Sequence, residues 1–194
     1  NAPQTVPLCA IPGYQRTIRE EMPALRPDLV NDLSALRREA IRVLLQRAGE
    51  NPDLAEPAFE VFFEARQQVI FYEDALPFLE FLKSRYPLVA LSNGNADVHK
   101  VGIGSFFVKA FNPLNLGVSK PDAKMFHAGA EALGVLPEEV LHIGDDPHMD
   151  VLGAQRAGMQ AVWLNRDQKQ WAHEVQPAPY TVDSLKALCD AWPL

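Results

Sequence analysis

Three carboxylates follow one short apolar segment, and their spacing suits a hard cation. Residues 140 to 143 are expected to form a strand, and Asp145, Asp146 and Asp150 come directly after it. Oxygen ligands on a short turn suit Mg²⁺, which binds one or two protein carboxylates and completes its shell with water and phosphate oxygens. The alternative is that these aspartates only cap a following helix, residues 149 to 157, and complement its dipole. The segment therefore indicates either a magnesium site for phosphate chemistry or an acidic helix cap.

Two further segments carry groups that suit an anion. The apolar run of residues 88 to 91 ends in Ser92, Asn93 and Gly94, so backbone N–H groups, a hydroxyl and an amide follow the expected strand. Lys120 precedes Pro121, which fixes how the chain enters an amphipathic helix over residues 123 to 133. Either segment alone could be an ordinary loop. In chain order with the acidic turn, they favour a phosphate-binding site.

The elements that must position these residues alternate regularly after residue 74. Helices are expected over residues 75 to 85, 124 to 133 and 149 to 157, and short apolar strands over residues 88 to 91, 140 to 143 and 161 to 164. This alternation predicts an α/β fold, a doubly wound Rossmann-like parallel sheet with right-handed crossovers. Ligands of such sheets bind beyond the carboxyl ends of the strands, where Ser92 and Asp145 both fall.

The chain before residue 74 has a different pattern of apolar residues. Apolar residues recur at three-and-four spacing over residues 32 to 48 and 57 to 68, and no segment reads as a buried strand. The aromatic residues of this region are expected to form its core: Phe59, Phe62, Phe63, Phe71 and Tyr72. We therefore predict a small all-helical cap domain over residues 1 to 73 and an α/β core domain over residues 74 to 194.

Composition narrows the class of protein and its partners. The chain has 194 residues and a net charge of −7 with no basic stripe, so nucleic acid is not an expected partner. There is no run of 18 apolar residues, so a membrane is not expected either. Cys9 and Cys189 fit no metal-ligand spacing, which favours reduced thiols in the cytoplasm. We expect a monomer or a homodimer.

Ser92, Lys120-Pro121 and the segment Gly144-Asp145 to Asp150 resemble the second, third and fourth motifs of the haloacid dehalogenase-like superfamily. The resemblance extends from about residue 74 to residue 165. It implies a phosphomonoester hydrolase that uses Mg²⁺ and forms an aspartyl-phosphate. Lys120 would contact the phosphoryl group, Ser92, Asn93 and Gly94 would bind its oxygens, and Asp145 would ligate the metal. Asp150 would orient Lys120 or a metal-bound water, whereas Asp146 would either cap the helix or contact the metal.

The chain departs from the family in one respect. The first motif of the superfamily, Asp-x-Asp at the end of the first strand, supplies the nucleophile and the general acid and base, and this sequence has no such motif. In the class with a cap inserted after that motif, the chain leaves the nucleophile strand at about the place where this sequence begins. We therefore expect the nucleophile on a central strand upstream of Asn1. Without that strand, buried backbone groups would be left unpaired at ~1 to 3 kcal/mol each. Donation of a strand from another chain is the alternative.

The substrate expected from the resemblance is a small phosphorylated metabolite. Among members of the superfamily, the sequence looks closest to bacterial phosphatases active on flavin mononucleotide and related ribityl or sugar phosphates. Two alternatives remain. Dehalogenation of 2-haloacids needs no Mg²⁺, so the acidic turn argues against it, and a non-catalytic binding protein would explain the missing nucleophile. His142 and His148 form no ligand pair and are interpreted as structural residues.

Overall fold

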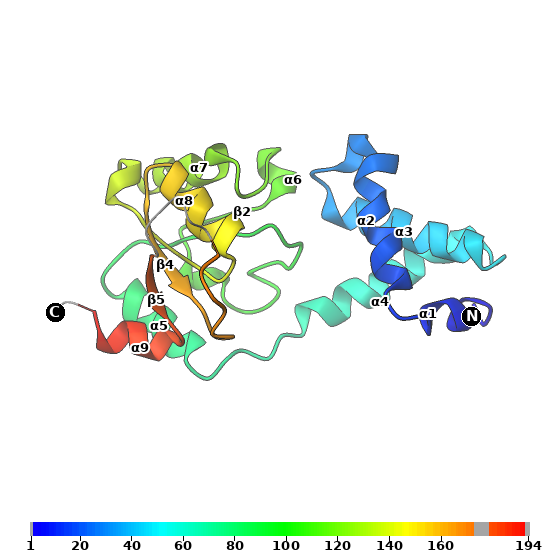
Figure 1. The fold of residues 1–194 in the computed structure, drawn as a ribbon, viewed down its shortest axis with the longest axis horizontal. Helices are drawn as coiled ribbons and strands as arrows, with labels where there is room; N and C mark the ends of the chain where they lie inside the picture. The colour runs from blue at the N-terminus through cyan, green and yellow to red at the C-terminus, as the bar shows by residue number, and fades with distance from the viewer. Residues whose placement is uncertain (1, 173–178, 193–194) are drawn as a thin grey trace. The chain divides into compact units, whose positions relative to one another are not determined.

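Helices alone build the first part of the chain, and helices alternating with parallel strands build the rest (Figure 1). The structure, a computed structural model, describes residues 2–172 and 179–192. It divides into two compact units. The first comprises Asn1–Val69 with Gly94–Asp97, and the second comprises Ile70–Asn93 with Val98–Leu194. We refer to them as the helical unit and the α/β unit.

The helical unit is held together by apolar side chains on one face of each main helix. Its helices are α1 (Thr5–Cys9), α2 (Tyr14–Leu25), α3 (Leu33–Arg47) and α4 (Ala55–Gln67), with 3₁₀ turns η1 (Pro27–Leu29) and η2 (Pro52–Leu54) between them. Ile18 and Met22 of α2 pack against Leu36 and Ala40 of α3, and all four side chains are buried. The described part of this unit contains only helices and turns, which is the all-helical character expected from the sequence.

The described part of the α/β unit contains five short strands, and every pairing between them is parallel. The strands are β1 (Val89–Leu91), β2 (Lys109–Phe111), β3 (Leu141–Gly144), β4 (Gln160–Leu164) and β5 (Tyr180–Val182). β1 pairs with β2, and β3, β4 and β5 form a separate three-stranded sheet in that order. The parallel α/β architecture is confirmed, but the described strands form two sheets.

Helices cover both faces of the sheets (Figure 1). On one side lie α5 (Ala75–Lys83) and α9 (Leu185–Asp190), which contribute Phe78, Leu82 and Leu188 to a buried cluster with Val162 of β4. On the other side, α7 (Ala123–Leu133) and α8 (Gly153–Arg156) contact the neighbouring residue of β4, Ala161, through a cluster that contains Phe126. Successive residues of β4 therefore face opposite helix layers, as a doubly wound fold requires.

A cavity of about 590 Å³ separates the two sheets inside the α/β unit. Val89–Leu91 of β1 line one wall and Leu141–Gly144 of β3 line the other, with Phe78 and Leu82 of α5 among the remaining apolar residues. Among the described residues, β1 pairs only with β2 and β3 only with β4, so both strands have an unpaired edge at this cavity. Ser92, Lys120, Asp145 and Asp150 line it as well, so its surface is not apolar throughout.

Several elements differ from the sequence expectation. β2 and β5 were not expected, and the expected helix over residues 149 to 157 is a π-helical turn, η5 (Pro147–Leu152), continued by α8. The short elements η3 (Gly104–Phe106), α6 (Pro113–Leu116) and η4 (Pro137–Glu139) occupy connections. Both cysteines are free thiols. No helix in the described ranges is long and apolar enough to cross a bilayer.

Candidate active site

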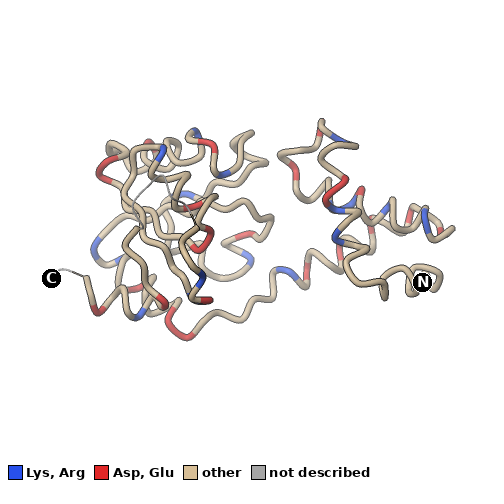
Figure 2. Tube along the Cα trace, viewed as in Figure 1, with Lys and Arg blue, Asp and Glu red and all other residues tan. Residues whose placement is uncertain are grey.

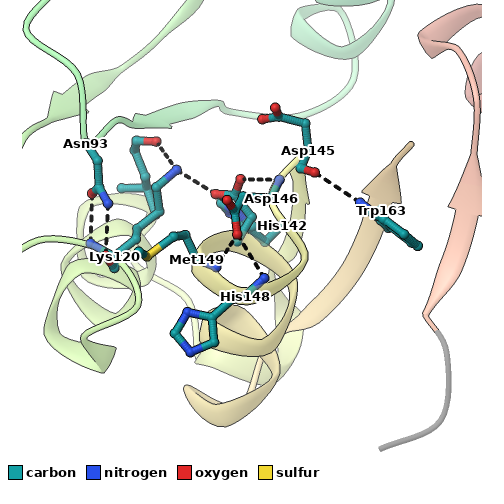
Figure 3. A network of polar contacts seen from close by, with 10 residues as sticks. Asn93, Lys120, His142, Asp145, Asp146, His148, Met149 and Trp163 are labelled. Atoms are coloured by element: carbon teal, nitrogen blue, oxygen red, sulfur yellow. Dashed lines mark hydrogen bonds and ion pairs between the residues drawn. The ribbon is translucent and has the colours of Figure 1, made fainter. Parts of the chain in front are cut away.

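The polar residues expected to act together follow the carboxyl ends of β1 and β3. Ser92 and Asn93 come directly after β1, Asp145 directly after β3, and Lys120 lies on the loop before α7. Figure 3 shows Asn93, Lys120, Asp145 and Asp146 in this region, with a chain of hydrogen bonds running from Asn93 through Lys120 to the acidic turn. The structure therefore brings the second, third and fourth sequence motifs to one end of the α/β unit.

The ammonium group of Lys120 is held by two acceptors. Its Nζ donates to the carbonyl oxygen of Leu91, at 2.9 Å, and to Oδ1 of Asp150, at 2.5 Å. The side chains of Lys120 and Asp150 are only 11% and 7% exposed. Because an ammonium group has three N–H donors, this arrangement leaves one of them for a further acceptor. Lys120 is thus a fixed, mostly buried cation rather than a mobile surface lysine.

The side-chain amide of Asn93 fixes the backbone of Lys120. Asn93 Nδ2 donates to the Lys120 carbonyl oxygen and Asn93 Oδ1 accepts from the Lys120 N–H, both at 2.8 Å. The sequence predicted that Asn93 would bind phosphate oxygens. The amide retains a second N–H on Nδ2 after these bonds, so that role stays a prediction. Ser92 donates its backbone N–H to Phe111 of β2 and lines the cavity.

Asp150 is the centre of the network. Its Oδ1 contacts both Lys120 Nζ and His142 Nε2, the latter at 3.1 Å, and its Oδ2 accepts the backbone N–H of Asp146 at 3.1 Å. Burial alone would raise the pKa of this carboxyl, but the hydrogen bond from His142 and the charge of Lys120 together lower the pKa of Asp150 well below its usual range. Asp150 is therefore a carboxylate at neutral pH despite its burial.

The π-helical turn explains how Asp150 reaches this position. The N–H groups of Asp150 and Val151 both donate to the carbonyl oxygen of Asp146, which widens the turn at η5. The Asp150 side chain consequently lies against Gly144 at the end of β3. A Cβ atom on Gly144 would be 2.4 Å from Cβ and Cγ of Asp150. Glycine is therefore required at position 144 for the carboxylate to approach the strand so closely.

The two aspartates proposed as metal ligands have different surroundings. Asp146 caps the π-helical turn, because its Oδ1 accepts the backbone N–H groups of His148 and Met149 at 2.9 and 2.7 Å. This is the helix-capping role left open by the sequence, and metal contact through its other oxygen stays a prediction. Asp145 is anchored through its backbone, whose carbonyl oxygen accepts from Trp163 Nε1 at 3.0 Å.

The Asp145 carboxylate is the group best suited to a metal. It is exposed and makes no hydrogen bond or ion pair with any described residue, and in Figure 3 it points away from the bonded carboxylate of Asp146. Among the described residues, no three His, Cys, Asp or Glu side chains converge as a metal-binding group. A single unengaged carboxylate fits Mg²⁺, which keeps several waters and needs few protein ligands. It does not fit an ion that requires a full cage of protein ligands.

Two placements fall outside the sequence expectation. Gly94 groups with the helical unit through the segment Gly94–Asp97. His142, interpreted from sequence as structural, contacts Asp150, and its ring packs edge-on against Phe126 with centroids 5.1 Å apart. Residues 142 and 144 lie on the same face of β3, as their spacing of two predicts. That spacing alone does not predict the contact with Asp150, because the contact also needs the turn at η5 to bring Asp150 to this face.

Comparisons with known proteins identify the family of this chain. Residues 10–158 match the family model described as "Hydrolase: haloacid dehalogenase-like hydrolase". The phosphoserine phosphatase of Thermus thermophilus is 33% identical over 147 residues, which are 73% of this chain and 59% of that protein. The 5-amino-6-(5-phospho-D-ribitylamino)uracil phosphatase of Escherichia coli is 32% identical over 151 residues, or 76% of this chain and 63% of that protein.

A solved structure is also similar over nearly the whole chain. The crystal structure of a 2-haloacid dehalogenase from Pseudomonas syringae superposes with a TM-score of 0.83 at 33% identity, covering 97% of this chain and 83% of the other. The chain therefore belongs to the haloacid dehalogenase-like hydrolases. It spans 59% and 63% of the lengths of the two phosphatases.

Proposed function

We propose that this protein is a Mg²⁺-dependent phosphomonoester hydrolase that acts on a small phosphorylated metabolite through an aspartyl-phosphate. The observation that carries the proposal is the buried Lys120 ammonium, which donates to the Leu91 carbonyl oxygen at the end of β1 and to Asp150 of η5 and has one N–H donor that no described residue uses. A cation positioned in this way can stabilise the charge on a transferring phosphoryl group.

Charge balance favours a dianionic substrate at this position. A phosphate dianion repels a carboxylate nucleophile, so positive charge must offset the repulsion. One charge pair at 4 Å contributes ~4 kcal/mol at an effective dielectric constant of 20. Asp150 offsets part of the Lys120 charge, so the site still needs additional positive charge. Asp145 supplies the means to add more, because its unengaged carboxylate can hold a cation.

Mg²⁺ is the cation that we propose for Asp145, with Asp146 as a second contact through the carboxylate oxygen that does not cap η5. When bound, Mg²⁺ supplies charge stabilisation to the phosphoryl oxygens. The protein's own contribution is to hold the carboxylates in place. The Trp163 indole fixes the backbone of Asp145, and the cap at η5 fixes the orientation of Asp146.

The nucleophile is proposed to be an aspartate on a further strand that fills the cavity between β1 and β3. The apolar walls of the cavity and the two unpaired strand edges support an extended segment there. Its last residue would end near Lys120. The carboxylate oxygen would attack phosphorus as the bond to the substrate oxygen breaks, and that oxygen would take a proton from a second carboxyl group. Water would then cleave the acyl phosphate, releasing phosphate and regenerating the aspartate.

The names of the relatives support a phosphomonoester substrate. Two matched proteins from different bacteria are named as phosphatases, and one of them acts, by its name, on a ribityl phosphate. This agrees with the expectation of flavin mononucleotide or a ribityl or sugar phosphate. We therefore place substrates of this class first in a screen.

A second candidate function is hydrolytic dehalogenation of a 2-haloacid. The similarity to the Pseudomonas syringae protein named as a 2-haloacid dehalogenase favours it. The unengaged Asp145 carboxylate argues for the phosphatase, because dehalogenation has no need of a metal-binding group at that place. A non-catalytic role is the remaining alternative and would leave the Lys120 network without a reaction to support.

One set of assays separates these functions. The complete gene product is tested with flavin mononucleotide, sugar phosphates and 2-chloropropionate, each with Mg²⁺ and with EDTA, beside an Asp145→Asn variant. We expect phosphate release that needs Mg²⁺ and falls at least about a hundredfold in Asp145→Asn, as for loss of one electrostatic contact to the transition state. Turnover of 2-chloropropionate in EDTA would establish the dehalogenase instead. Equal phosphatase activity in both variants would exclude the metal assignment, and no turnover of any substrate would favour the binding protein.

A further inference from the structure

The helical unit carries eight arginines, and they fall into two groups. Five of them form ion pairs with glutamate or aspartate side chains: Arg16, Arg26, Arg38, Arg42 and Arg47. The other three are Arg19 of α2, Arg37 of α3 and Arg66 of α4, and no carboxylate of the described residues pairs with them. Figure 2 marks the acidic and basic residues along these helices.

Two sets of contacts connect Arg37 with Arg66, one through Phe62 and one through Asn95 and Ser34. The guanidinium carbon of Arg37 lies 4.8 Å from the ring centroid of Phe62, which precedes Arg66 by one helical turn on α4. Arg66 Nε donates to Asn95 Oδ1 at 3.0 Å, and Asn95 Nδ2 donates to the hydroxyl of Ser34 at 3.1 Å. Ser34 in turn precedes Arg37 by one turn on α3. The Arg37 guanidinium stacks on Phe62 and donates no hydrogen bond to a described residue, so the N–H donors at its edge are available to a further acceptor.

Arg19 completes the cluster. Its neighbour Ile18 and the neighbour of Arg37, Leu36, are buried in the same apolar cluster between α2 and α3. Burial lowers the pKa of the Arg37 guanidinium, and the positive charges of Arg19 and Arg66 lower it further, so Arg37 lies within range of both charges. Like charges gathered in this way repel one another, and a bound anion would offset that repulsion.

We infer that Arg19, Arg37 and Arg66 form a binding site for an oxyanion, a phosphate, sulfate or carboxylate group carried by a small molecule. Guanidinium groups present planar pairs of N–H donors that match two oxygens of such a group, and they lose less hydration than an ammonium when they bind it. Asn95 and Ser34 hold the Arg66 side chain in place, and Phe62 holds Arg37. The site is thus built in advance on three packed helices.

The anion has two possible sources. It is either a second anionic group on the substrate, remote from the phosphate that reacts, or a free inorganic anion that regulates the protein. The first source rests on the proposed phosphatase function, whereas anion binding itself does not. The test therefore begins with binding in EDTA, where the metal-dependent site described above does not contribute.

Inorganic sulfate is the probe, and the arginine Nε–H signals of the ¹⁵N-labelled protein are the readout. We expect saturable shifts of the Arg37 and Arg66 signals with sulfate, and none with chloride at equal ionic strength. Arg37→Met, which keeps an apolar side chain over Phe62, should weaken sulfate binding about tenfold or more, as for the loss of one charge-assisted hydrogen bond. Arg38→Met is the matched control. Arg38 also lies on α3 and stacks on a ring, that of Phe59 at 4.0 Å, but it pairs with Glu56, so sulfate binding should be unchanged.

A kinetic comparison separates the two sources. With a substrate that bears a second anionic group, Arg37→Met should raise KM about tenfold with little change in kcat, while p-nitrophenyl phosphate, which lacks such a group, should be unaffected. Sulfate binding that depends on Arg37 without this KM effect would identify a free anion as the ligand. Sulfate shifts that do not saturate, or equal affinities in wild type and Arg37→Met, would overturn the site. Absence of all phosphatase activity would leave the binding result standing and would refute only the proposed function.

Discussion

Replacing Asp150 by asparagine should destabilise the α/β unit far more than a change of one carboxylate normally does. The side chains of Lys120 and Asp150 are 11% and 7% exposed, and Lys120 Nζ lies 2.5 Å from Asp150 Oδ1. At that distance the Coulomb attraction is roughly 6 to 7 kcal/mol at a dielectric constant of 20, which bounds the effect from above. Removing one partner of a buried pair typically costs ~3 to 5 kcal/mol, because the other charge stays buried and unpaired. That is a large part of a net stability of ~5 to 15 kcal/mol.

Urea unfolding followed by far-ultraviolet circular dichroism measures this change. With a urea m value of about 2 kcal/mol/M, a cost of ~3 to 5 kcal/mol lowers the midpoint by roughly 1.5 to 2.5 M. The control is Asp167→Asn. Asp167 also pairs with a lysine, Lys169, but these side chains are 70% and 63% exposed, so the free energy of unfolding should be nearly unchanged.

A double variant tests whether the unpaired charge is the cause. Lys120→Met combined with Asp150→Leu removes both charges and keeps apolar volume, so it should be more stable than Asp150→Asn alone. Equal midpoints for Asp150→Asn and Asp167→Asn would refute the reasoning. The reasoning would also be refuted if the double variant lost as much unfolding free energy as Lys120→Met and Asp150→Leu lose separately when added together, because independent effects add and coupled ones do not.

Three further predictions concern the same unit. The pKa of Asp150 is lowered on folding, so the unfolded chain takes up this proton more readily than the folded chain. The stabilisation by the Asp150 carboxylate is therefore complete above pH ~4. The difference in unfolding free energy between wild type and Asp150→Asn should shrink as the pH falls from 4 to 2 in a series of urea titrations. Gly144→Ala should cost ~1 to 3 kcal/mol in the same assay because its Cβ would meet Asp150 at 2.4 Å, whereas Gly129→Ala, whose Cβ would meet only the flexible end of Leu91 at 3.4 Å, should cost less. His142→Phe should keep the packing against Phe126 but remove a hydrogen bond to Asp150, lowering the unfolding free energy by ~1 to 3 kcal/mol; a change below 0.5 kcal/mol would contradict the contact.

The sequence predicted those elements whose apolar periodicity is complete. α3, α4 and α7 have apolar residues at three-and-four spacing, and β1, β3 and β4 are short apolar runs that end in polar turns. β2 and β5 were missed because they are three residues long and carry polar or charged residues: Lys109 opens β2, and Tyr180 and Thr181 open β5. Their pairing depends on a neighbouring strand and not on a local pattern.

The sequence could predict which residues of the candidate site meet, but not the hydrogen bonds that they form. Parallel strands end at one edge, so the meeting of Ser92, Lys120 and Asp145 follows from the element order. The contact of His142 with Asp150 could not be foreseen, because it depends on the wide turn at η5. The expected helix over residues 149 to 157 would have implied α-helical spacing, and the π-helical turn changes the direction of the Asp150 side chain.

The two hydrogen bonds between the Asn93 amide and the Lys120 backbone make the lysine insensitive to the length of its own loop. The Asn93 side-chain amide offers one N–H donor and one oxygen acceptor, as a peptide group does. Its bonds to the Lys120 backbone therefore fix the position of Lys120 along β1, in the way that a neighbouring strand would. The segment between β2 and Lys120, including α6 and Gly117, can then vary without moving the ammonium group. Insertions or deletions near Leu114, an exposed residue on α6, are therefore compatible with an unchanged lysine position, whereas no change of loop length can compensate for the loss of Asn93.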